Sequence, residues 1–462
     1  SSGGRPLEPA GDLAPAWRRL LAQGNTRAEE GKLQEALSDY LEAHDELEAT
    51  SPYDAAGSAM LLMNIGVTHA ELGDLGKALE AYDRARSALE AAGRLDGRNG
   101  ARLLMNIIIA KAIQGDADGA IDEFSAARGL LESEGALRSR EGVGLLTRMG
   151  DLLAGRDDFA GAAGEYEAAL GALRRQRRLG SKVGVELLER LGDAHLELGA
   201  AGEALEHFTT ARGVLESRGR LRTARGAKLL VKLGDAHLEE ASIQEALEAY
   251  GLARGVLEAD GTINDEQGAS LLANIGALQA EQGQMEEALA AFAEARKAFE
   301  ASGSMASREG AGLLANTGTA RLKQGDVEAA YEELAAARRA FEAEGALQTE
   351  EGASLLTSLG EAQALRGNAE EAQAAFEAAR KILADLHLLA SPSAAELFAK
   401  IGDALIGQGR FNEALSQLET AHGILEAQDI LETPTGAALL ASIGVAHAEG
   451  GNFDEAFEAL EA

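Results

Sequence analysis

A repeat of 42 residues runs along the chain and constrains its fold more than any other feature. Counting from Gly24 in steps of 42, ten of the eleven positions are glycine and the third is Ile108. We call these the anchor positions: Gly24, Gly66, Ile108, Gly150, Gly192, Gly234, Gly276, Gly318, Gly360, Gly402 and Gly444. No insertion or deletion interrupts the series. A period of this length predicts a repeat array, in which each unit buries its apolar face against its neighbours.

Apolar residues recur after each anchor with the spacing of a helix. In the first repeat they are Ala36, Tyr40, Ala43 and Leu47. The first alanine is present in all eleven repeats, and the ring position holds Tyr, Phe or Leu. Steps of four, three and four residues place these side chains on one face of a helix. We call this predicted helix B.

A second helix, helix A, is predicted around each anchor. It carries a Leu-Leu pair such as Leu61-Leu62, and its start is marked by a residue that favours the N-cap position. These caps are Ser139, Ser181, Thr223, Asp265, Ser307, Thr349, Ser391 and Thr433. Glycines between the helices, from Gly31 to Gly451, predict tight turns, and six more from Gly93 to Gly345 predict left-handed ends for helix B.

A glycine inside helix A needs a compensating gain, because it costs about 1 kcal/mol relative to alanine. We expect the small residue to let the ring of helix B approach the backbone of helix A. Ile108 then predicts that Phe124 lies further from helix A than its equivalents in the other repeats.

The pattern Leu-x2-[Ile/Leu]-Gly…Ala-x3-[Tyr/Phe]-x2-Ala resembles the tetratricopeptide repeat consensus. The period of 42 residues instead of 34 is similar to the longer-helix branch that includes kinesin light chain and nephrocystin-like proteins. The usual Trp position holds Leu or Phe398, and the usual Tyr position holds His69, His195, His237 and His447, among others. The resemblance implies an all-α fold, a right-handed α-solenoid of eleven helix-turn-helix repeats over residues 14–462. Residues 1–13 are expected to form a flexible lead rich in Pro and Gly.

Composition argues against several classes of function. The net charge is −33, so most of the surface should repel nucleic acid and anionic lipid. No apolar run is long enough to cross a membrane, and the chain has no cysteine. We find no phosphate-binding loop, zinc-protease or nucleophile-elbow motif. We therefore expect no enzyme activity, cofactor or metal, and we interpret the four His residues as packing residues.

One candidate binding site lies on helix A, two residues before each anchor. We call these the groove positions, because the resemblance implies that they line the concave groove of the solenoid. Our candidates are Asn64, Asn106, Arg148, Arg190, Lys232, Asn274, Asn316 and Lys400; Ser358 and Ser442 hold the same position. Asn could bond a ligand backbone and the cations a carboxylate, although a plain solvated face would look the same. Asp151, Asp193 and Asp235 each follow a basic groove position by three residues, a spacing that allows an ion pair within the helix.

The second candidate is a reversal of charge. Between Arg174 and Lys232 thirteen basic residues stand against seven acidic ones. Two successive loops from helix B to helix A carry most of them: Arg174, Arg175, Arg177, Arg178 and Lys182, then Arg218, Arg220, Arg222, Arg225 and Lys228. Because equivalent loops lie along one edge of a solenoid, we call this set the basic edge and expect it to attract an acidic segment.

Two functions are consistent with these features. The first is a non-catalytic scaffold or adaptor that docks protein partners within a larger assembly. The alternative is a cargo or chaperone adaptor that grips one extended peptide tail in the groove. The apolar face of the last repeat also suggests a continuing chain or self-association through that end. We expect a soluble protein of the cytoplasm or, if a presequence was removed before Ser1, of an organelle interior; association with a membrane complex stays open.

Overall fold

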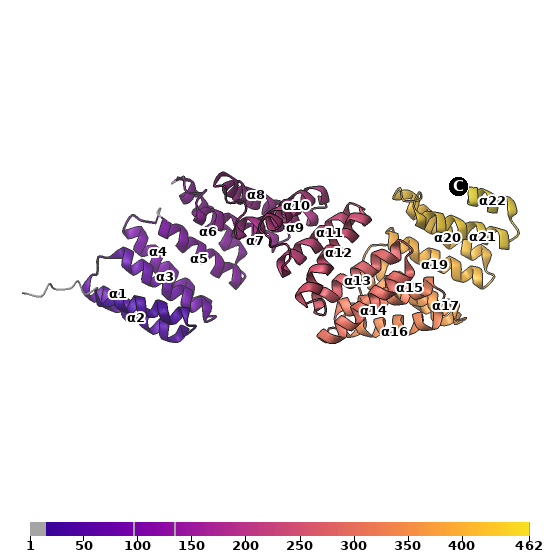
Figure 1. The fold of residues 1–462 in the computed structure, drawn as a ribbon, viewed down its shortest axis with the longest axis horizontal. Coiled ribbons are helices and arrows are strands. Elements are labelled where there is room, and N and C mark those ends of the chain that lie inside the picture. Colours follow the sequence, from indigo (N-terminus) through magenta and orange to yellow (C-terminus); the bar gives the residue numbers. More distant parts are fainter. Residues whose placement is uncertain (1–14, 96–97, 134, 462) are drawn as a thin grey trace, which may run out of the picture. The chain divides into compact units, whose positions relative to one another are not determined.

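The computed structural model describes residues 15–95, 98–133 and 135–461, and these residues form 22 helices and no strand (Figure 1). Each odd-numbered helix is a helix A and packs against the even-numbered helix B that follows it. The all-α fold of eleven helix pairs that the period predicts is therefore confirmed. The expected lead, residues 1–13, lies outside the described residues.

The chain divides into two units, Ser1–Gly219 and Arg220–Ala462. The helices of unit 1 are α1 (Ala16–Glu29), α2 (Leu33–Thr50), α3 (Ala55–Glu71), α4 (Leu75–Ala91), α5 (Arg98–Gln114), α6 (Ala117–Ser133), α7 (Arg140–Ala154), α8 (Phe159–Arg175), α9 (Lys182–Glu197) and α10 (Ala201–Ser217). Those of unit 2 are α11 (Ala224–Glu239), α12 (Ile243–Asp260), α13 (Glu266–Glu281), α14 (Met285–Ser302), α15 (Arg308–Lys323), α16 (Val327–Ala343), α17 (Glu350–Leu365), α18 (Ala369–Asp385), α19 (Pro392–Gly407), α20 (Phe411–Ala427), α21 (Pro434–Glu449) and α22 (Phe453–Glu461).

The predicted N-caps of helix A are confirmed in all eight repeats that carry them. Each cap side chain accepts a hydrogen bond from the backbone N–H three residues later, as Ser181 does from Gly184. Pro392 and Pro434 occupy the first turn of α19 and α21, where the missing N–H costs nothing. Every such cap satisfies a donor that the helix leaves unpaired, which fixes where helix A begins.

Seven of the ten anchor glycines lie against a ring of helix B, as expected, and Gly318, Gly402 and Gly444 lie against the leucine that replaces it. A Cβ atom on Gly276 would lie 2.6 Å from Cε1 of Phe292, and one on Gly24 would lie 2.6 Å from Cε1 of Tyr40. The first alanine of helix B is at most 5% exposed in every repeat, so it too sits at a helix contact. Ile108 and Phe124 are both buried; the larger separation between them stays a prediction.

The turn glycines take the positive φ angles that their positions require. Five residues that are not glycine adopt the same left-handed conformation at equivalent positions. They are Asp157, Arg177, Ala241, His387 and Asp429. For a residue with a Cβ this conformation costs roughly 1–2 kcal/mol. The sequence alone gave no sign that these five turns would keep the conformation without a glycine.

Candidate functional site

The groove positions lie beside the helix A of the preceding repeat. Four of them form a hydrogen bond or an ion pair with the residue directly after the anchor of the preceding repeat. That residue always lies 39 positions earlier in the chain. The pairs are Asn64 Nδ2 to Asn25 Oδ1 at 3.4 Å, Arg190 Nε to Asp151 Oδ1 at 3.1 Å, Thr319 Oγ1 to Ser358 Oγ at 3.2 Å and Lys400 Nζ to Glu361 Oε1 at 2.8 Å. These contacts connect consecutive repeats within each unit.

The residue after the anchor also bonds the ring of helix B in its own repeat. The Tyr166 hydroxyl donates to Asp151 Oδ1 at 2.8 Å, the same oxygen that lies 3.1 Å from Arg190. Burial, and then this bond to Asp151, raise the pKa of Tyr166. Tyr40 and Tyr250 make equivalent bonds to Asn25 and Asp235. A single polar side chain therefore joins helix A, helix B and the next repeat.

At Asp151, the ion pair within helix A that the spacing allowed is replaced by a contact between repeats. Asp151 pairs with Arg190 of the next repeat and not with Arg148 three residues before it. The physical reason is that Tyr166 holds the carboxylate toward helix B, whereas an exposed pair within one helix gains only about 0.5 kcal/mol. Lys232 and Asn274 are engaged as well, the latter with the Tyr250 hydroxyl.

Three of the eight candidate groove positions remain without a bond, as does Ser442, with respect to the residues that the structure describes. Asn106, Arg148 and Asn316 make no hydrogen bond or ion pair with any residue that the structure describes. The residue 39 positions earlier is apolar in each case: Val67, Ile109 and Ala277. The polar groups of these three side chains are therefore available to a ligand.

Asn316 faces a hollow of about 370 Å³ between α15 and α17 of unit 2. Gly312 and Ala315 line it on α15, Leu355 lines it on α17 and Phe341 on α16. An ion pair of 2.6 Å between Arg308 and Glu351 lies at the same hollow. A backbone hydrogen bond, then the Thr349 side chain and then Arg308 hold the pKa of Glu351 below its usual range. The hollow thus combines small and apolar walls with one unpaired amide.

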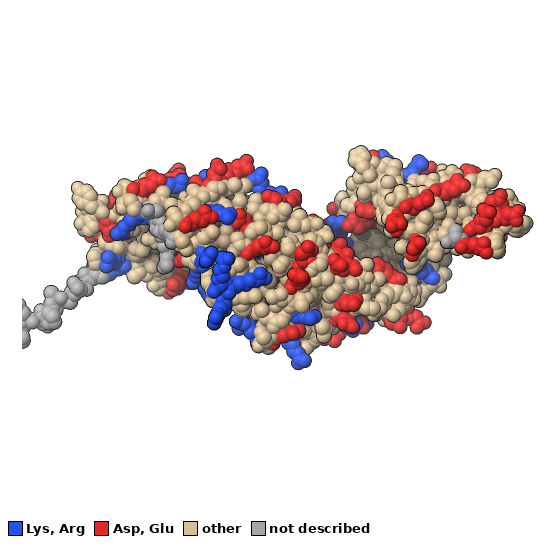
Figure 2. All heavy atoms as spheres, turned by 90° about the horizontal axis from the view of Figure 1, so that it is seen from above, with Lys and Arg blue, Asp and Glu red and all other residues tan. Residues whose placement is uncertain are grey.

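The part of the basic edge in unit 1 is exposed. Arg174, Arg175, Arg177, Arg178 and Lys182 are all exposed, and their loop contains no acidic residue. In unit 2, Arg220, Arg222 and Lys228 are exposed, whereas Arg225 has a polar partner. Figure 2 shows Lys and Arg side chains gathered together in a view where acidic side chains are otherwise widely spread.

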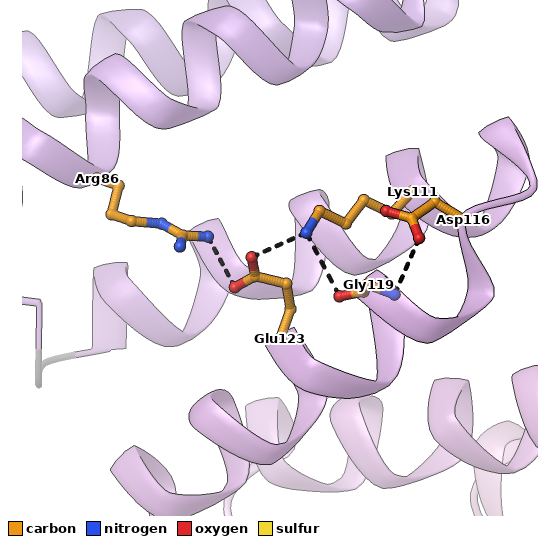
Figure 3. A network of polar contacts seen from close by, with 5 residues as sticks. All are labelled: Arg86, Lys111, Asp116, Gly119 and Glu123. Carbon is orange, nitrogen blue, oxygen red and sulfur yellow. Dashed lines mark hydrogen bonds and ion pairs between the residues drawn. The ribbon is translucent and has the colours of Figure 1, made fainter.

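A second set of contacts between repeats, which sequence reasoning missed, connects successive B helices. In Figure 3, Arg86 of α4 donates to Glu123 of α6 at 2.7 Å, and Lys111 of α5 reaches the same carboxylate at 3.2 Å. The pairs Arg128–Glu165 and Arg296–Glu333 repeat this geometry 42 and 210 residues later. Arginine recurring at the period of the repeat was the available signal. These arginines stabilise the array and are not candidates for partner binding.

Two of the histidines of unit 1 lie together. His195 of α9 lies beside His207 of α10, with ring centroids 5.2 Å apart. Burial, and then His195, lower the pKa of His207. Among the described residues no group of three or more His, Asp or Glu side chains could hold a metal ion. No helix in the described ranges is long and apolar enough to cross a membrane.

Comparison with known proteins supports the interpretation of the repeat. A family model described as tetratricopeptide repeat matches residues 399–462. No curated protein sequence matches the chain. Proteins with this repeat are generally protein-binding modules and usually non-catalytic.

Several solved structures are similar in fold. The apo form of RapI has a TM-score of 0.60 and 13% identity, over 80% of this chain and 98% of that one. Aspartyl phosphate phosphatase F from Bacillus subtilis has a TM-score of 0.48 and 12% identity, over 83% and 96%. A tetratricopeptide repeat protein from Parabacteroides merdae has a TM-score of 0.44 and 15% identity, over 66% and 98%. The similarity to RapI shows a common fold and says nothing about activity.

The family match covers the last 64 residues, but its characteristic glycine, alanine and ring positions recur with the same spacing through eleven helix pairs. The chain therefore matches the tetratricopeptide repeat family over residues 399–462 and carries the same repeat pattern along the rest of its length.

Proposed function

We propose that the protein is a non-catalytic scaffold that docks segments of partner proteins at separate points along its A helices, within a larger assembly. The observation that carries this proposal is the unpaired Asn316 at the hollow between α15 and α17. A carboxamide can donate and accept hydrogen bonds at once, so it matches a peptide group of an extended segment. The apolar walls at Phe341 and Leu355 suit a small apolar side chain of that segment.

The alternative is an adaptor that grips one extended peptide along the whole groove. Such a grip would use one groove position per repeat, each hydrogen bond contributing about 1 kcal/mol. Arg190, Ser358 and Lys400 are already bonded to neighbouring repeats. A peptide would have to displace those contacts, so the geometry favours separate docking points over a continuous grip.

Filling the hollow should abolish docking there without harming the fold. A Cβ atom on Gly312 would meet no atom within 4 Å, so Gly312→Leu adds bulk inside the hollow and removes a helix glycine. The test begins with peptides that are selected from a displayed library for binding to the full chain. Some of these peptides should bind the Gly312→Leu variant about tenfold or more weakly than they bind the unmodified chain. Asn316→Ala should weaken the same peptides about fivefold, as expected for one hydrogen bond.

Ala438→Leu is the matched control, because Ala438 is exposed at the equivalent position of α21. It should leave the binding of these peptides unchanged. If every selected peptide binds Gly312→Leu as tightly as the unmodified chain, the hollow is not a docking site and the proposal fails.

A further inference from the structure

Three loops of unit 1 join to form one basic surface, and part of it escaped sequence reasoning. The Gln176 side chain donates to the backbone carbonyl of Arg138, which brings the α8–α9 loop against the α6–α7 loop. The Arg218 guanidinium lies against Gly180, so that a Cβ there would be 2.9 Å from Nη2. Arg138 and Arg140 are exposed and belong to the same surface, although the sequence interpretation began at Arg174.

The cations of the central loop are poorly neutralised. Residues 174–185 contain five basic side chains and no carboxylate. Arg174, Arg175 and Arg177 form no ion pair with any described residue, and Lys182 is 3.8 Å from its partner Glu186. In a chain with a net charge of −33, such a surface is a local exception that attracts negative charge.

Arg177 adds an independent observation, because its backbone is strained. Its φ is 54°, in the left-handed region, where six equivalent loops place a glycine. His387 and Asp429 take the same conformation at the equivalent position of other loops, and only the loop of the basic surface places an arginine there. The side chain that this strain holds is a cation at the centre of the basic surface.

We propose that the unit 1 part of the basic edge, extended by Arg138 and Arg140, is a second docking site and binds an acidic segment of a partner protein. An acidic protein segment fits better than nucleic acid or an anionic membrane, because those extended polyanions would also meet the acidic surface of the rest of the chain. The site is independent of the hollow at Asn316, so either can fail without the other.

The decisive variant is Arg177→Gly, which should change stability and binding in opposite directions. Relief of the left-handed strain should raise the Tm by about 2–4 °C, while loss of the cation should weaken binding of a fluorescein-labelled peptide of Glu, Asp and Gly residues about threefold. Ala241→Gly is the matched control. Ala241 has a φ of 53° in unit 2, outside the basic surface, so this change should raise the Tm without altering binding.

Charge reversal gives the larger effect on binding. Arg175→Glu with Arg178→Glu should reduce affinity for the acidic peptide tenfold or more, and binding to the unmodified chain should fall as salt is added. The control is Arg339→Glu with Lys381→Glu, an equal charge change at exposed positions of α16 and α18. Equal losses in both double variants, or no loss in the first, would overturn the proposal.

Three further outcomes would also overturn it. Tighter binding of vesicles rich in anionic lipid, or of a single-stranded oligonucleotide, would assign the surface to another class of partner. If the full chain associates with itself, and Arg175→Glu with Arg178→Glu abolishes that association, the basic surface binds a second copy of the chain. Unchanged peptide binding in Arg177→Gly would show that this residue is not part of the site.

Discussion

Replacing Gly276 with leucine should lower the free energy of unfolding by about 3 kcal/mol. A Cβ atom at this anchor would already lie 2.6 Å from Phe292 and 3.1 Å from the Ala288 carbonyl oxygen, and leucine adds three more carbons. Phe292 is 1% exposed, so its neighbours enclose the ring. The gain in helix propensity, about 1 kcal/mol, is too small to offset the overlap. Urea denaturation followed by circular dichroism measures the loss.

Gly255→Leu is the control for this prediction. Gly255 lies within α12, and a Cβ atom there would meet no atom within 4 Å, so the same substitution should leave stability unchanged or raise it slightly. Because repeats contact only their neighbours, the effect of Gly276→Leu should be concentrated around α13 and α14, where hydrogen exchange should accelerate. Equal stability of the two variants would contradict the role assigned to the anchor glycine.

Stability should also fall steeply as the pH rises above 10, because buried tyrosines resist ionisation. Burial, and then Glu71, raise the pKa of Tyr82 from 10 to about 12. A pKa above the unfolded value means that the stabilisation is complete below pH 10 and is lost as the pH rises toward 12. For Tyr82 the loss is about 3 kcal/mol. Burial raises the pKa of Tyr40, Tyr166 and Tyr250 in the same direction.

Tyrosinate absorbance and helical circular dichroism, recorded together against pH, test this prediction. The buried tyrosines Tyr40, Tyr82, Tyr166 and Tyr250 should ionise only as the helices unfold. Tyr82→Phe should leave stability near pH 7 almost unchanged, since Phe208 holds the equivalent position, and should raise it at about pH 11. Ionisation of these four buried tyrosines in a chain that keeps its helices would contradict the account.

The sequence predicted the helices well, because every determinant of a helix pair is local and recurs. The spacing of alanine and ring, the N-caps and the turn glycines each act within one 42-residue repeat. The anchor contact could also be predicted, since a glycine within a helix implies a close neighbour. The conformation of Arg177 could not be predicted, because it is imposed by the surrounding repeat fold and opposes the local preference of the residue.

The candidate site was harder to predict, because availability of a groove position depends on a residue in another helix. Arg190 and Arg148 look equivalent in sequence, yet Arg190 meets Asp151 whereas the corresponding partner position of Arg148 holds Ile109. That offset of 39 residues follows from how neighbouring A helices pack, which no pattern within one repeat reveals. Once it is known, the sequence explains why Arg190 is engaged and Arg148 is not.

The central claim is that the chain docks partners at separate points. Simultaneous binding of two peptide segments tests this claim most directly. One peptide would be a library-selected ligand whose binding is weakened by Gly312→Leu. The other would be the acidic peptide, whose binding is weakened by Arg175→Glu with Arg178→Glu. Titrating the second peptide into the saturated complex of the first, with distinct fluorophores, should give a ternary complex and an unchanged affinity for each. Mutual displacement of the two peptides, or loss of both in either variant, would instead indicate one continuous binding site and contradict the scaffold account.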